Sequence, residues 1–168
     1  MISLFIFGCI GLPGYVYNIS NTKIELTVKQ LVVEKSEYFK NPFTFMIIVD
    51  SSPCGKMLTE TIWWADWQKH MIERDIGFVI ATSRADSMDV VIAADLDNVK
   101  APVLVLPSCE KYVSELDPFP GIVPLKILTD STGTVIYGKV YIPDTAASNK
   151  MISKIDSLIN SKITVSAK

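Results

Sequence analysis

Short continuous apolar runs separate longer segments in which apolar residues recur every three or four positions. The runs Phe45–Val49 and Phe78–Thr82 are rich in β-branched and aromatic residues, which is typical of strands covered on both faces. Val103–Leu106 is a third, shorter run. Leu125–Leu128 and Val135–Tyr141 flank a polar turn that contains glycine, so we expect them to pair as a hairpin. The pattern predicts a sheet with the first two runs in its interior.

Helical periodicity appears between these runs. Met57–Arg74 carries two adjacent apolar stripes, and we expect Gly77 to end this helix. Asp89–Leu96 and Glu110–Leu116 are shorter helical segments, and Thr145–Ser161 is a final helix with one apolar face. Strands that alternate with helices predict an α/β fold, with a mixed central sheet and helices on both faces.

The segment before the first apolar run is expected to extend the sheet. Within Asn21–Lys35, the residues Ile24, Leu26 and Val28 alternate with polar ones, which is the period of a strand with one buried face. A chain of 168 residues is the size of one domain. We therefore expect one domain over residues 21–168, with an N-terminal strand extension.

Composition limits the classes of function. The chain has 16 Lys and Arg against 18 Asp and Glu, and it has no basic run, so we expect no nucleic-acid partner. Three cysteines, Cys9, Cys54 and Cys109, are too few for a disulfide framework or a four-cysteine zinc site. The single histidine, His70, adds little, and we expect it on the surface. We therefore expect no metal and no cofactor.

Residues 1–20 form an apolar segment and a spacer that contains glycine and proline. The apolar part is shorter than the ~20 residues of a membrane-spanning helix, but it resembles the end of a secretory signal. Ile6–Cys9 resembles the lipobox of bacterial lipoproteins, in which the cysteine is lipidated. No positive charge and only eight residues precede Cys9, as when a start codon is placed too late. Cys9 is either a lipidation site that attaches the protein to a membrane or part of an apolar first strand.

Cys54 has the clearest chemical signal. It follows the strand Phe45–Val49 and the strand-breaking Asp50–Pro53, and a long helical segment comes next. We therefore expect its thiol at a helix N-terminus, where unpaired backbone N–H groups and the helix dipole favour the thiolate. Gly55 and the positive Lys56 are the expected thiolate-stabilising residues. The alternative is a small hydrophobe buried in a strand-to-helix corner.

Most of the chain resembles a thioredoxin-like domain, and two motifs carry the resemblance. Cys54–Met57 lies between a strand and a helix and matches the family's C-G-x-C motif in all but the last position. Gly121–Pro124 precedes the hairpin and is similar to the family's cis-proline loop. The resemblance implies that Pro124 is cis and packs beside Cys54, and that the backbone of Val123 binds the substrate.

A wider pattern points to one branch of this family. Cys54-Gly55-x-Met57-Leu58-x-Glu60, with a tryptophan downstream, is similar to the envelope branch of bacterial thioredoxin-like proteins. That branch includes cytochrome-maturation and alkyl-hydroperoxide-reductase types, which are often lipid-anchored. The resemblance implies a location in the bacterial cell envelope, facing the periplasm, and a protein or small-molecule partner that carries a thiol or disulfide.

Met57 replaces the second cysteine of the family motif. A thioether forms no disulfide, so Cys54 would act as a monothiol that an external thiol resolves. Three functions stay open: a monothiol thiol–disulfide oxidoreductase, a redox-inactive binding module of the envelope, and a one-cysteine peroxidase. The peroxidase motif P-x-x-x-T-x-x-C is poorly met, with Ile47 at the proline position and Ser51 at the threonine position. We expect Cys109 to be structural.

Overall fold

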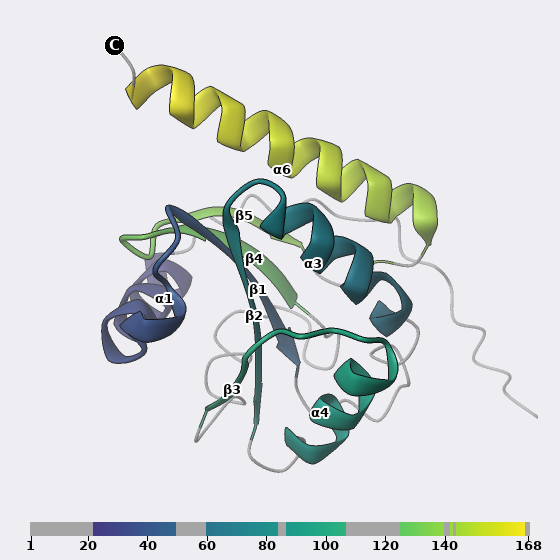
Figure 1. Ribbon diagram of the computed structural model, residues 1–168. Helices are drawn as coiled ribbons and strands as arrows, with labels where there is room; N and C mark the ends of the chain where they lie inside the picture. The colour runs from purple at the N-terminus through teal and green to yellow at the C-terminus, as the bar shows by residue number, and fades with distance from the viewer. Residues whose placement is uncertain are drawn as a thin grey trace, which may run out of the picture.

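The computed structural model describes residues 22–49, 60–83, 87–106, 125–139, 142 and 144–166. Figure 1 shows how these elements are arranged. In chain order they are α1 (Thr22–Glu34), η1 (Ser36–Tyr38), β1 (Phe43–Val49), η2 (Thr61–Trp63), α3 (Trp64–Ile72), β2 (Ile76–Ser83), α4 (Ser87–Leu96), β3 (Val103–Leu106), β4 (Leu125–Asp130), β5 (Val135–Lys139) and α6 (Thr145–Ser166).

The five strands form one mixed sheet in the order β3-β2-β1-β4-β5. β1 lies in the middle, parallel to β2 and antiparallel to β4, and all of its residues after Phe43 are buried. β3 is parallel to β2, and β5 is antiparallel to β4 as the second strand of the hairpin. The predicted mixed sheet with its interior β1 is therefore confirmed. A continuous apolar run is needed there because β1 has side chains packed on both faces.

Helices cover both faces of the sheet (Figure 1). One face packs against α3, α4 and α6, and its buried residues alternate along each strand with those of the other face. The second face packs against α1 and Phe39, which follows η1. Residues that share the first face include Phe45, Ile47, Phe78, Ile80, Trp64, Trp67, Met71, Val90, Ala94, Met151 and Ile155. Helices on both faces were predicted, and this prediction is confirmed.

The predicted N-terminal strand extension is wrong, because residues 22–34 form the helix α1. Val28, Leu31 and Val32 are buried against the sheet, and their spacing of three and four is helical. The polar Gln30 and Glu34 lie on the exposed side. The alternation read in the first half of the segment is too short to distinguish a strand from a helix. The second half of the segment has the helical period, and the apolar residues with this spacing pack on the sheet.

The predicted end of the long helix is also wrong. α3 ends at Ile72, and Gly77 lies inside β2 rather than at a helix terminus. Asp75 turns the chain with a φ of 56°. The side-chain amide of Asn41 donates to Asp75 Oδ1 at 2.9 Å, which holds this left-handed residue in place. The final helix was predicted correctly in type and continues to Ser166.

Candidate functional site

The residues predicted to carry the chemistry lie outside the described part of the chain. They are Cys54, Gly55, Lys56, Val123 and Pro124, together with Cys9, Cys109 and the predicted helix Glu110–Leu116. Their contacts therefore stay predictions. What the structure defines is the set of elements that flank the Cys54 and Pro124 segments.

These flanking elements meet at one end of the sheet. β1 ends at Val49, five residues before Cys54, and β4 begins at Leu125, immediately after Pro124. Ile48 pairs with Leu125 across β1 and β4, while Val49 pairs with Thr82 across β1 and β2. The chain therefore leaves β1 toward Cys54 at the same end of the sheet at which it arrives from Pro124.

A buried ion pair lies beside this end of the sheet. Lys126, the second residue of β4, places its Nζ 2.5 Å from Oε1 of Glu60, and both side chains have no solvent exposure. Glu60 Oε1 also accepts a hydrogen bond from the backbone N–H of Ile142, which follows β5. The glutamate therefore connects the start of the helical segment before α3 to β4 and to the chain after β5.

Burial makes this pair sensitive to protonation. Desolvation raises the pKa of Glu60 above its ordinary value, although the positive charge of Lys126 opposes the rise. Desolvation also lowers the pKa of Lys126 to about 8, although Glu60 opposes that fall. Both shifts favour the uncharged forms, so a proton can be gained or lost here nearer to neutral pH than at an exposed pair.

Unsatisfied polar atoms gather on the same side of the sheet. Among the described residues, the buried side-chain atoms without a hydrogen-bond partner are Glu60 Oε2, Trp64 Nε1 and Thr82 Oγ1. Glu60 and Trp64 are four residues apart at the start of the α3 segment, so they share a helix face. Thr82 follows Phe78 and Ile80 on the face of β2 that packs against α3. Buried polar groups are rarely unpaired, so each of these three atoms carries a cost in stability.

Sequence reasoning missed Lys126. The sequence indicates Glu60 only as part of the wider motif and gives it no role of its own. A signal was present, because Lys126 stands between Leu125 and Ile127 in a strand whose other residues up to Thr129 are buried. A lysine inside such a run requires a buried partner, but the partner lies 66 positions away and only the fold identifies it.

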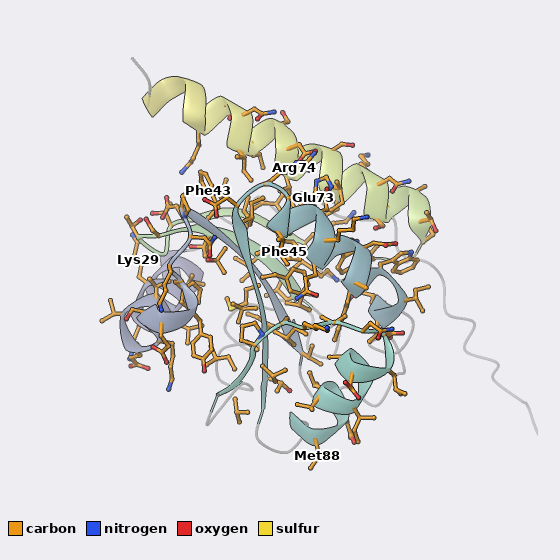
Figure 2. The ribbon with its side chains drawn as sticks, viewed as in Figure 1. Lys29, Phe43, Phe45, Glu73, Arg74 and Met88 are labelled. Atoms are coloured by element: carbon orange, nitrogen blue, oxygen red, sulfur yellow. The ribbon has the colours of Figure 1, made fainter. Side chains whose placement is uncertain are left out.

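His70, which the sequence predicts on the surface, is partly buried where α3 meets α6. Its side chain is only 22% exposed, and its Nε2 lies 3.0 Å from Oδ1 of Asp156 on α6. Arg74 lies in the turn that follows α3, and its Nε is 2.7 Å from the same carboxylate oxygen. Figure 2 shows Arg74 directed toward α6. These three residues hold α3 and α6 together.

No three histidine, cysteine or acidic side chains come together in the described ranges as they would to hold a metal ion. No helix in these ranges combines the length and the apolar character that crossing a membrane requires.

No protein-family model matches the sequence, and no curated protein matches it. Solved structures do match the fold. A thiol:disulfide interchange protein DsbE from Chlorobium tepidum has a TM-score of 0.55 at 15% identity, over 73% of this chain and 84% of that one. The thioredoxin domain of a Bacteroides vulgatus thiol-disulfide oxidoreductase has a TM-score of 0.52 at 13% identity, over 70% and 81%. StoA from Bacillus subtilis has a TM-score of 0.50 at 14% identity, over 68% and 84%.

Similarity at these identities establishes the fold alone and does not establish the chemistry of this protein. In this chain that fold is the mixed five-stranded sheet with β1 in its middle and helices on both faces. This protein therefore has the thioredoxin-like fold.

Proposed function

We propose that this protein is a monothiol thiol–disulfide oxidoreductase that acts through Cys54. The supporting observation is the convergence of the two flanking segments. The chain that carries Cys54 joins the central strand β1 to the α3 segment, and it leaves the sheet where the chain that carries Pro124 arrives. The fold neighbours that are described as thiol–disulfide oxidoreductases and interchange proteins give further support.

The proposed chemistry is thiol–disulfide exchange in two steps. In the first, the Cys54 thiolate attacks one sulfur of a substrate disulfide; a Cys54–substrate S–S bond forms, the original S–S bond breaks, and the other sulfur leaves as a thiolate that takes a proton from water. In the second, an external thiolate attacks the substrate sulfur and Cys54 leaves as a thiolate. One disulfide and one thiol are thereby exchanged for another disulfide and thiol. Met57 gives no internal route for the second step.

Glu60 and Lys126 are the described residues that we propose to influence this thiol. Glu60 is six positions after Cys54, and Lys126 is two positions after Pro124. A buried carboxylate with an unpaired Oε2 disfavours a second negative charge nearby, so it would oppose ionisation of the thiol. Protonation of Glu60, which its raised pKa favours, would remove that opposition.

A thiol titration tests the proposal. In a Cys9→Ser/Cys109→Ser background, the pH dependence of Cys54 alkylation should report a pKa about one unit below the ordinary ~8.5 of a thiol. Adding Glu60→Gln should lower that pKa further, because the buried negative charge is removed. A thiol that is inaccessible, or that titrates at or above ~8.5, would contradict the oxidoreductase assignment.

A resolving cysteine tests the monothiol assignment. Met57→Cys should form an internal disulfide with Cys54 under mild oxidation and should shorten the lifetime of a mixed disulfide with a small-molecule probe. Met57→Ser is the matched control, because it removes the thioether without adding a thiol. The prediction fails if Met57→Cys leaves both thiols free and the mixed disulfide equally long-lived.

A redox-inactive binding module is the second candidate. It is favoured because Met57 stands where the family motif has its second cysteine. Cys54→Ser separates the two functions. It abolishes disulfide exchange under the first proposal, whereas a binding module retains its partner without the thiol. Turnover of peroxide would instead favour the one-cysteine peroxidase.

We also propose that the protein works in the bacterial cell envelope, attached through a lipid on Cys9. The support is the apolar segment that ends at Gly8-Cys9 and the spacer that follows. Mass spectrometry of the protein isolated from its own cells is the test. A lipidated Cys9 as the N-terminal residue is expected, and an intact, unmodified Met1 would refute the proposal.

A further inference from the structure

The outer side of α4 is apolar where a surface helix is normally polar. Val90, Ala93 and Ala94 are buried against the sheet side of the helix. Met88, Val91, Ile92 and Leu96 are the exposed hydrophobic residues of α4, with Met88 at 67% and Leu96 at 77%. We call these four residues the α4 apolar face. By contrast, the exposed positions in the first three turns of α6 include Asn149, Lys150, Ser153 and Lys154.

The geometry of this face is that of a helix-packing stripe. Met88, Ile92 and Leu96 are spaced by four residues, so they form one ridge that is about 12 Å long at 1.5 Å per residue. Figure 2 shows Met88 on the side of α4 that is turned away from the sheet. Val105 of the edge strand β3 is also exposed, at 41%, and lies on the sheet face that α4 covers. A single partner helix fits a ridge of this length.

The charges on α4 discriminate between partners. Asp89 and Asp95 are both exposed, and the helix carries no lysine or arginine. In an antiparallel pair of two copies centred on Ile92, Asp89 of each copy lies opposite Asp95 of the other. In a parallel pair, each aspartate lies opposite itself. Both arrangements bring carboxylates together without a cation on the helix, so a second copy of this chain fits the face poorly.

We propose that the α4 apolar face is a docking surface for an amphipathic helix of a partner protein, in which apolar residues spaced by three or four are flanked by lysine or arginine. The apolar ridge provides the buried contact, and Asp89 and Asp95 select a basic partner over an acidic one or a second copy. This inference does not involve Cys54, so its test is independent of the oxidoreductase proposal.

Two synthetic helical peptides serve as probes. Both carry leucines at positions i, i+4 and i+8; one has lysines beside these leucines, and the other has glutamates at the same places. Fluorescence anisotropy with the full chain should give at least about tenfold tighter binding of the lysine peptide, and this preference should shrink as salt is added. Ile92→Ser should weaken binding of the lysine peptide by about tenfold or more, as expected for a residue at the centre of an interface.

Charge reversal makes the test decisive. Asp89→Lys/Asp95→Lys should reverse the preference, so that the glutamate peptide binds more tightly. Val33→Ser is the matched control, because Val33 is 79% exposed on α1, which packs on the opposite face of the sheet, and it should leave both affinities unchanged. The proposal is overturned if neither peptide binds, if both bind equally, if the preference survives charge reversal, or if sedimentation shows a dimer that Ile92→Ser dissociates.

Discussion

Lys126 shows how one residue can be both costly and necessary. Its ammonium lies in a fully buried position on β4, where the carboxylate of Glu60 offsets the loss of hydration. Lys126→Met leaves that carboxylate buried without this cation, and we expect the free energy of unfolding to fall by roughly 3–5 kcal/mol. Urea unfolding followed by tryptophan fluorescence measures the loss.

The double variant Glu60→Gln/Lys126→Met is the control for this change. The glutamine keeps an oxygen that accepts the Ile142 N–H, and no charge stays buried. It should recover at least half of the lost stability, because replacing a whole buried pair costs far less than breaking it. A double variant as unstable as the single one would show that the pair is not the cause.

Gly133 is required by conformation and by space. Its φ is +81°, and a Cβ built there would lie 2.6 Å from Cα of Lys29 on α1. Gly133→Ala should therefore destabilise the protein by roughly 2–4 kcal/mol, through backbone strain and overpacking. Hydrogen exchange should also show weaker protection of α1, because the helix must move away from the β4–β5 turn.

Asn98→Gly provides the comparison for Gly133. Asn98 also has a positive φ, 57°, but its side chain is exposed, so glycine there should change stability by less than about 1 kcal/mol. If the two substitutions change the free energy of unfolding equally, the close approach of Gly133 to α1 is not the cause of the loss.

At the scale of elements, α6 is fixed to α3 by a buried hydrogen bond as well as by apolar packing. Trp67 Nε1–H donates to Ser148 Oγ at 2.7 Å, and both groups are buried. Ser148→Ala leaves the indole N–H without this acceptor, and we expect a loss of about 1–3 kcal/mol in thermal or chemical unfolding. Ser153→Ala on the same helix is exposed and should be neutral or slightly stabilising. Similar losses in both variants would point to the helix itself rather than to the bond.

At the scale of the whole molecule, the buried pair makes stability depend on pH. Lys126 has a pKa of about 8 when folded and an ordinary value of 10.5 when unfolded. Between these values the unfolded chain binds more protons at this site, so the free energy of unfolding rises with pH, by about 1.4 kcal/mol for each unit of pKa difference. Glu60, with its raised pKa, acts in the opposite sense at lower pH, where stability falls as the pH rises from 4.5.

The measurement is the difference between the wild-type protein and Glu60→Gln/Lys126→Met across pH 7 to about 9.5. Other titrating groups, such as Tyr137 and Lys139, are common to both proteins and largely cancel. The wild-type protein should gain stability relative to the variant as the pH rises above about 8. A difference that stays constant across this range would show that Lys126 keeps an ordinary pKa.

The strands of this protein could be predicted because a strand buried on both faces has a continuous apolar run in its own sequence. β1 and β2 are continuous apolar runs, and the β4–β5 turn contains Gly133, so each segment contains its own evidence. α1 could not be predicted in the same way. Its first residues alternate like a strand, and only the docking of Val28, Leu31 and Val32 on the sheet selects the helix.

Of the candidate site, the sequence identified Cys54 by residue type and by its place between a strand and a helix, and its reactivity stays a prediction. By itself the sequence determined the alternation of strands and helices and the interior position of β1, because hydrophobic periodicity is a local property. Only the tertiary structure decided that Lys126 meets Glu60, that His70 meets Asp156 and that the outer side of α4 stays exposed. These contacts and exposures depend on distances between residues far apart in the chain, which no local pattern encodes.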